Sequence, residues 1–133
     1  MILTQYGSRK LKMEIERIAL FINKLSEKSK LGAIDWRVET SNSYQTLISG
    51  YKVTISQHID EDEFSGGDFS DPDYIIGLYK SSNSQWVDSF SDDEMKDYIN
   101  GSFKIMQGIY RDARRKSNNV SAIIEDLISG LDE

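Results

Sequence analysis

Residues 44–57 have the sequence YQTLISGYKVTISQ, and this stretch decides the fold class. It contains two runs of strand-forming residues on either side of a Ser-Gly pair, which is typical of a β-hairpin turn. In the second run, Tyr51, Val53 and Ile55 alternate strictly with polar residues. Because successive side chains of a strand point to opposite faces, the alternation predicts an antiparallel sheet with one face packed and the other in water.

The neighbouring sequence supplies more strands for this sheet. Apolar Trp36 and Val38 alternate with charged residues over 35–39, as in a half-buried strand. Two further strands are indicated at 74–80 and 85–90, with four polar residues between them. We therefore expect four or five strands, connected in sequence order as a meander.

The N-terminal part of the chain is predicted to be one long helix. Its apolar residues recur at intervals of four and three and form a narrow stripe, which consists of Leu11, Ile15, Ile18, Ile22 and Leu25. Ser8 is the expected N-cap, and the helix should end near Leu31 and Gly32. Met13 and Leu20 point away from the stripe, which leaves a helix-mediated homodimer open.

A second long helix is predicted after the sheet. Ser91 and Glu94 are three residues apart, as in a capping box, and acidic residues suit the first turn of a helix. The apolar phase continues unchanged over 95–113, across an Asn-Gly pair at 100–101. We therefore expect one unbroken helix to about Lys116.

A short last helix is predicted with Ser121 as its N-cap. Its expected packing stripe consists of Ile124, Leu127, Ile128 and Leu131. The order of elements predicts an α+β fold, with an N-terminal long helix, an antiparallel β-meander of four or five strands, then a long helix and a short C-terminal helix packed on one face of the sheet. A chain of 133 residues has the usual size of one domain, and we expect residues 1–133 to form it.

Composition excludes several classes of protein. The chain contains no Cys, which excludes disulfides, thiolate metal sites and cysteine nucleophiles. No apolar run approaches the roughly 20 residues that cross a bilayer, and the first residues lack the features of a signal peptide. We therefore expect a cytoplasmic protein without a membrane partner.

Charge is distributed unevenly along the chain, whose net charge is −6. Residues 1–58 hold nine Lys and Arg against five Asp and Glu, whereas residues 59–99 hold two against twelve. Residues 100–133 hold five of each sign. The acidity is therefore a property of one central stretch, and such a local excess of negative charge favours a partner with a basic surface.

The most acidic part of this stretch lies between two predicted strands. Its candidate partner-binding residues are Asp60, Glu61, Asp62, Glu63, Asp68, Asp71 and Asp73. A calcium-binding EF-hand loop counted from Asp60 needs Gly at its sixth position and Glu at its twelfth, where the chain has Ser65 and Asp71. The motif fails, so no metal site is predicted, and the segment is either a partner-binding surface or a solvated connection.

The sequence contains no recognisable catalytic constellation. His58 is the single histidine, and it stands at the end of a predicted strand, where a structural role is the usual one. The chain has no Gly-x-Ser-x-Gly nucleophile motif and neither of the common glycine-rich phosphate loops. We therefore predict no catalytic residues, no cofactor and no enzymatic activity.

Three basic residues recur on the second long helix. Lys104, Arg111 and Arg115 are seven and four residues apart, on the side opposite the apolar stripe, and Gly101 and Gly108 lie close to them in sequence. A phosphate chain or a partner backbone could approach such a surface closely. Basic residues near a helix C-terminus also complement its dipole, so an ordinary exposed surface is the competing interpretation.

The leading functional hypothesis is a small non-enzymatic interaction protein that presents an acidic surface to a basic protein partner. A regulator, an inhibitor and an immunity-type partner all fit this description. The alternative is a nucleic-acid-binding or nucleotide-binding accessory protein that uses the basic residues of the second long helix, although whole-chain acidity counts against tight nonspecific DNA binding. A metal-dependent hydrolase using the acidic segment and His58 ranks below both.

Overall fold

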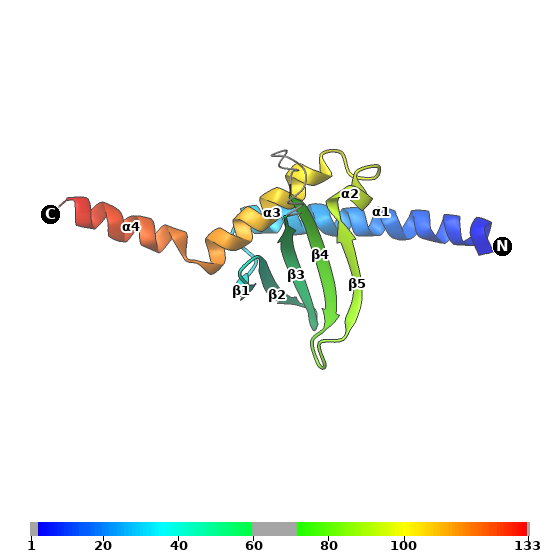
Figure 1. Ribbon diagram of the computed structural model, residues 1–133, viewed down its shortest axis with the longest axis horizontal. Coiled ribbons are helices and arrows are strands. Elements are labelled where there is room, and N and C mark those ends of the chain that lie inside the picture. The colour runs from blue at the N-terminus through cyan, green and yellow to red at the C-terminus, as the bar shows by residue number, and fades with distance from the viewer. Residues whose placement is uncertain (1–2, 60–71, 133) are drawn as a thin grey trace, which may run out of the picture.

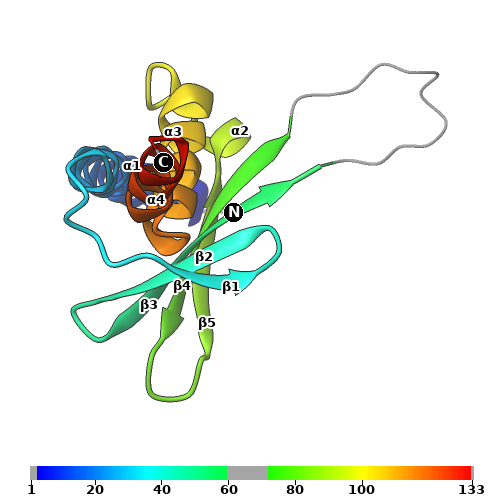
Figure 2. The ribbon, with the colours of Figure 1, turned by 90° about the vertical axis from the view of Figure 1, so that its left-hand side faces the viewer.

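The computed structural model describes residues 3–59 and 72–132, which form an antiparallel sheet with helices on one of its faces (Figures 1 and 2). The elements in chain order are α1 (Leu3–Lys30), β1 (Arg37–Thr40), β2 (Ser43–Ile48), β3 (Tyr51–His58), β4 (Asp73–Lys80), β5 (Trp86–Ser91), α2 (Asp92–Met95), α3 (Ser102–Ser117) and α4 (Val120–Leu131). The predicted α+β fold is confirmed, because one helix precedes a five-stranded sheet and a long and a short helix follow it.

The sheet is a meander in which each strand pairs with the next, in the order β1-β2-β3-β4-β5. Ile48 and Tyr51 close the hairpin between β2 and β3, and the residues between them, Ser49 and Gly50, have φ angles of 53° and 81°. Two positive φ angles are typical of a type I′ turn, which matches the twist of hairpin strands. The predicted hairpin is therefore confirmed, and its turn fixes which side chains share a face of the sheet.

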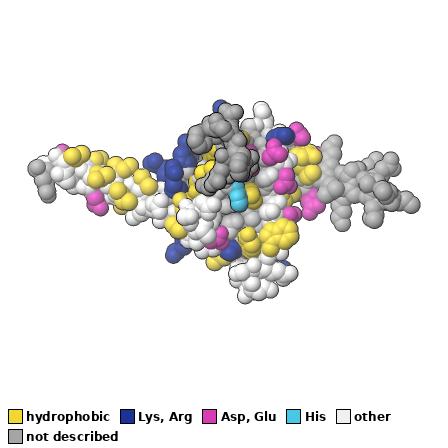
Figure 3. Space-filling view, viewed as in Figure 1, with side chains coloured by type: hydrophobic (Ala, Val, Ile, Leu, Met, Phe, Trp, Pro, Cys, Tyr) yellow, Lys and Arg dark blue, Asp and Glu magenta, His cyan; other side chains and the backbone are white. Residues whose placement is uncertain are grey.

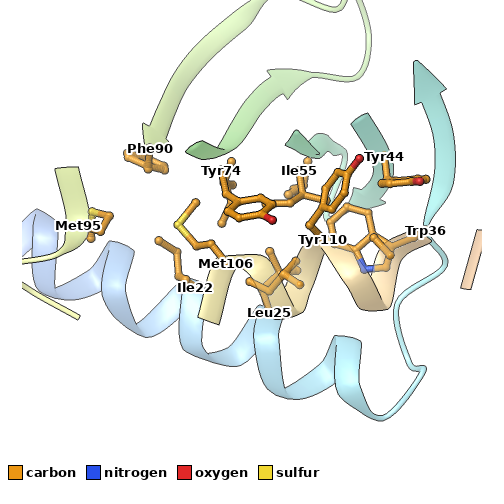
Figure 4. Close-up of a cluster of buried hydrophobic side chains, with 14 of the residues drawn as sticks. Ile22, Leu25, Trp36, Tyr44, Ile55, Tyr74, Phe90, Met95, Met106 and Tyr110 are labelled. Carbon is orange, nitrogen blue, oxygen red and sulfur yellow. The ribbon is translucent and has the colours of Figure 1, made fainter. Parts of the chain in front are cut away.

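The inner face of the sheet packs against α1 and α3. Ile55 of β3 is fully buried and lies opposite Tyr44 of β2 and Ile76 of β4. Figure 4 shows side chains of both helices pointing into this cluster, where the ring of Tyr110 lies 5.3 Å from that of Tyr44 and 5.5 Å from that of Tyr74. Burial raises the pKa of the Tyr110 phenol above its ordinary value, and the neighbouring Tyr44 adds to the rise.

β1 departs from the half-buried strand predicted over 35–39. The alternation predicts that Trp36 and Val38 both lie on the packed face. Trp36 is only 2% exposed, but Val38 is 53% exposed. The strand begins at Arg37, and the Trp36 indole N–H donates a hydrogen bond of 3.1 Å to Ser29 Oγ in the last turn of α1. Trp36 is therefore anchored by the helix, and β1 is an exposed edge strand.

The single helix predicted over 92–116 is divided into α2 and α3, so that prediction is wrong. Six residues separate the two helices, and α3 begins at Ser102 after Gly101, whose φ is 74°. The Asp92 carboxylate accepts a hydrogen bond of 2.8 Å from the Tyr74 N–H, and the Asp92 carbonyl accepts one of 2.9 Å from the Ser102 hydroxyl. These buried bonds hold α2 against β4 and the start of α3. The helix is therefore interrupted between α2 and α3, although the apolar spacing continues across the break.

The predicted helix ends are partly confirmed. The Glu94 N–H donates a hydrogen bond of 3.1 Å to Ser91 Oγ, as the capping box predicts. Gly32, with φ of 70°, follows the end of α1 and closes it with the two hydrogen bonds of a Schellman motif. The start differs from the prediction, because α1 begins at Leu3 rather than after Ser8.

α4 begins with Asn119 as its N-cap, rather than with Ser121. It contacts α3 but projects away from the sheet (Figure 1). None of its residues is buried, so the stripe expected to pack stays exposed in the described part of the chain. The core is thus closed by α1, α2 and α3.

None of the described helices covers the outer face of the sheet (Figure 2). Here the side chain of Tyr79 lies against Gly77, which pairs with Thr54 of the neighbouring strand. A Cβ atom on Gly77 would lie 2.6 Å from Thr54 Oγ1 and 2.9 Å from Tyr79 Cε2, so any larger residue here must displace one of these side chains. Thr54 is buried on this face, and its hydroxyl and the Tyr79 ring both lie beside Gly77.

We predict that Gly77→Ala lowers the free energy of unfolding by about 1–3 kcal/mol, because the added methyl group overpacks the contact with Thr54 and Tyr79. Gly108→Ala is the matched control. A Cβ atom on Gly108 meets nothing within 4 Å, and Ala is the better helix former by about 0.8–1 kcal/mol, so this variant should gain stability. Urea unfolding measures the free energy of unfolding of both variants. A Gly77→Ala variant that is as stable as the original chain would contradict this packing.

Candidate functional site

Of the seven predicted partner-binding residues, the structure describes one, Asp73. The other six lie outside the described residues and are Asp60, Glu61, Asp62, Glu63, Asp68 and Asp71. Asp73 is exposed at the start of β4, where it lies opposite His58, the last residue of β3. The segment 60–71 therefore connects the end of β3 to the start of β4, at the end of the sheet where His58 and Asp73 lie.

More carboxylates lie at the same end of the sheet. The end of β5 pairs with the start of β4, and α2 follows β5 directly. The hydrogen bond from Tyr74 to Asp92 holds α2 at this position. Figure 3 shows acidic side chains gathered over α2. We name as the acidic end the exposed residues Asp73, Asp93, Glu94 and Asp97.

One cation lies beside the acidic end. Lys96 Nζ is 3.3 Å from Asp93 Oδ1, and both side chains are well exposed. Such an exposed pair contributes little, because water screens it and two long side chains must be ordered. Within the described residues, the acidic end thus keeps an excess of negative charge on a backbone held by the sheet and by the buried bonds of Asp92.

The basic residues predicted on the second helix do share one surface. Lys104, Arg111 and Arg115 are all exposed on α3 and fall on one side of it at 100° per residue. No described carboxylate lies within 4.0 Å of them. Gly108 leaves open space on this side, whereas Gly101 serves as the left-handed residue before α3. We name these three residues the basic stripe.

His58 has no catalytic partners among the described residues. It is exposed at the end of β3 opposite Asp73. Over residues 3–59 and 72–132, no group of three His, Asp or Glu side chains could hold a metal ion. The hydrolase hypothesis therefore gains no support from the described geometry.

A row of side chains across the outer face of the sheet was missed by sequence reasoning. Its members lie opposite one another on β2, β3, β4 and β5 and are Leu47, Lys52, Tyr79 and Trp86. Lys52 Nζ lies 4.6 Å from the centre of the Tyr79 ring and 3.0 Å from the Glu39 carboxylate. Leu47 is 68% exposed and Trp86 is 57% exposed. The hairpin turn implies this row, because it sets the register of the strands.

A groove between α1 and the end of β2 was also missed. It has a volume of about 420 Å³, and its apolar lining includes Leu20, Phe21 and Ile48. The basic residues that line it are Arg17, Lys24 and Lys28. Leu20 is 46% exposed, and Met13, two turns before it, is 71% exposed, so both point away from the packing stripe as predicted. We name this feature the α1 groove.

Comparison with models of protein families, with curated proteins and with solved structures found no match. No helix in the described part of the chain is long and apolar enough to cross a membrane. Any function must therefore be argued from these surfaces.

Proposed function

We propose that the chain is a non-catalytic protein-interaction module that presents its acidic end to a partner with a basic surface. The observation that carries this proposal is topological. The start of β4 and the segment 92–97, which begins with α2, meet beside the end of β5 at one end of the sheet, and they bring to it the exposed carboxylates Asp73, Asp93, Glu94 and Asp97. In the sequence, the segment 60–71 between β3 and β4 holds six more carboxylates and no basic residue.

Rigid attachment makes this charge effective in binding. Asp73 belongs to a paired strand, and α2 is tied to the sheet through Asp92. Charges held in place need little ordering when a partner binds, so less of the interaction free energy is lost. A concentrated negative field also accelerates encounter with a basic surface. These properties suit a regulator, an inhibitor or an immunity-type protein that covers a basic site.

The acidic end can be tested with two variants of equal net charge. Replacement of Asp73, Asp93 and Asp97 by Lys changes the net charge from −6 to 0 without touching the caps of α2. Replacement of Glu27, Asp35 and Asp132 by Lys does the same at exposed positions elsewhere. We expect basic proteins captured from the native host by the unaltered chain to be lost from the first variant and kept by the control.

Salt dependence provides the quantitative part of this test. Binding of the captured partner, measured by surface plasmon resonance, should weaken as ionic strength rises, with most of the change in the association rate. Equal capture by both variants would contradict the proposal. A third variant has Asp60, Asp62, Glu63 and Asp68 replaced by Lys. If this variant loses the partner and the first variant keeps it, the binding surface is the segment 60–71 rather than the acidic end.

A second candidate function rests on the basic stripe. Lys104, Arg111 and Arg115 are exposed on one side of α3, and Gly108 leaves room for close approach of a backbone. Eleven residues of helix span about 17 Å, which is a suitable length for several successive phosphates. A nucleic-acid-binding or nucleotide-binding accessory role is therefore the alternative that the described geometry favours next.

Binding of fluorescently labelled RNA and DNA at two salt concentrations tests this alternative. If the basic stripe binds phosphates, replacing its three residues by Ala should reduce the slope of log K against log salt by about two to three. The control replaces Lys30, Arg37 and Lys80, which are exposed elsewhere, and should keep the slope. Absence of binding by the unaltered chain at low salt would remove the alternative.

A further inference from the structure

The sequence contains one Asn-Gly pair, Asn100 and Gly101, which lies in the connection between α2 and α3. Asn is a thermolabile residue, because the backbone nitrogen of the next residue can attack its side-chain amide carbon. Gly permits this attack most readily, since it has no Cβ atom to hinder the approach. The connection between α2 and α3 therefore carries a chemically reactive pair.

The structure leaves both reacting groups of this pair accessible. Asn100 and Gly101 are exposed. The Ser102 N–H donates a hydrogen bond of 3.2 Å to the Ile99 carbonyl, so residues 99–102 form a turn, with a φ of 74° at Gly101. This turn uses neither the Asn100 side chain nor the Gly101 N–H, and neither group makes a hydrogen bond to another described residue. The attacking nitrogen and the amide carbon are thus not held apart by other bonds.

Two other Asn residues, Asn42 and Asn83, are also followed by a small residue, Ser, but their side-chain amides are held in place. Asn42 Nδ2 donates a hydrogen bond of 2.9 Å to the Gln57 carbonyl. Asn83 Oδ1 accepts a hydrogen bond of 3.0 Å from the Gln85 N–H. Neither amide can turn towards the next backbone nitrogen without breaking its bond.

The remaining three Asn residues have a bonded or hindered attacking nitrogen. Asn23 lies inside α1, where the next N–H belongs to the hydrogen bonds of the helix. The Asn119 N–H, which would attack Asn118, donates a hydrogen bond of 3.2 Å to the Lys116 carbonyl. Asn119 is followed by Val120, whose branched side chain crowds the backbone. The local structure therefore favours the reaction at only one of the six Asn side chains.

We propose that Asn100 is a site of spontaneous deamidation in the folded protein. The Gly101 nitrogen loses its proton to water and forms a bond to the Asn100 Cγ atom. The bond from Cγ to Nδ2 then breaks, and ammonia leaves with the transferred proton. Water opens the resulting cyclic imide at either of its two carbonyl groups. Opening at one carbonyl gives aspartate, and opening at the other gives isoaspartate, in which the backbone runs through the side-chain carbons.

The two products change the structure differently. Both add one negative charge three residues after Asp97 of the acidic end and just before α3, whose first turn contains no acidic residue. Aspartate keeps the length of the backbone, and its charge complements the positive end of the helix dipole. Isoaspartate adds a backbone carbon close to Ser102, whose hydroxyl donates the buried hydrogen bond to the Asp92 carbonyl. We therefore expect isoaspartate, but not aspartate, to weaken the attachment of α2 to α3.

Prolonged incubation of the purified chain in heavy-oxygen water at mildly alkaline pH tests the proposal, because base removes the proton from the attacking nitrogen. Trypsin then releases residues 97–104, a peptide whose single Asn is Asn100, and mass spectrometry with electron-transfer fragmentation distinguishes aspartate from isoaspartate. We expect heavy oxygen and both products in this peptide, with several times more conversion than at Asn42 or Asn83. The heavy oxygen excludes deamidation during digestion.

The same chain unfolded in guanidinium chloride is the control for the native structure. Unfolding breaks the hydrogen bonds that hold Asn42 and Asn83, so the difference between these two sites and Asn100 should shrink. Absence of conversion at Asn100 in the folded chain overturns the proposal, whatever happens in the unfolded chain. Equal conversion of the three sites in the folded chain overturns it as well.

Two variants separate the reaction from its consequence. Asn100→Ser removes the amide, so residues 97–104 should take up no heavy oxygen. Asn100→Asp reproduces one product and should unfold at the same denaturant concentration as the original chain or at a higher one. The isoaspartate form, purified by ion-exchange chromatography, should unfold at a lower concentration. If it unfolds together with Asn100→Asp, the turn tolerates the added backbone carbon, and the expected weakening of the contact between α2 and α3 is wrong.

Discussion

The packing of α3 between α1 and the inner face of the sheet is the interaction on which the rest of the structure depends. Met106 and Ile109 of α3 are fully buried, and the ring of Tyr110 contacts those of Tyr44 and Tyr74 from two different strands. Fully buried side chains of this size each contribute about 1.5–3 kcal/mol to folding. Because α1, α2 and α3 close this core, the outer face of the sheet and the whole of α4 are left to solvent.

Much of this fold can be predicted from the sequence, because local chemistry and tertiary structure agree. The type I′ turn after Ile48 and the cap at Ser91 are local features, and both are observed. The break before Ser102 was missed because it depends on Asp92, whose hydrogen bonds join segments distant in sequence. The exposure of Val38 was not predicted for a similar reason. The alternation suggests a packed side chain, but β1 lies at the edge of the sheet, which the local sequence does not show.

The candidate surfaces were predictable to different degrees. Charge is visible in the sequence, so the basic stripe and the acidity near α2 could be anticipated, although only the strand order shows that α2 lies beside Asp73. The α1 groove could not be anticipated, because it combines Leu20 with Ile48 from another element. The apolar stripe of α4 was recognised, but periodicity cannot show whether such a stripe packs on its own sheet or on another chain.

The central claim is that the sheet, α1, α2 and α3 form the core without α4. Chemical unfolding of a chain ending at Ser117 tests this claim most directly, compared with the full chain at concentrations low enough to keep both monomeric. The account predicts free energies of unfolding that agree within about 1 kcal/mol. A truncated chain that is unfolded, or less stable by several kcal/mol, would contradict it.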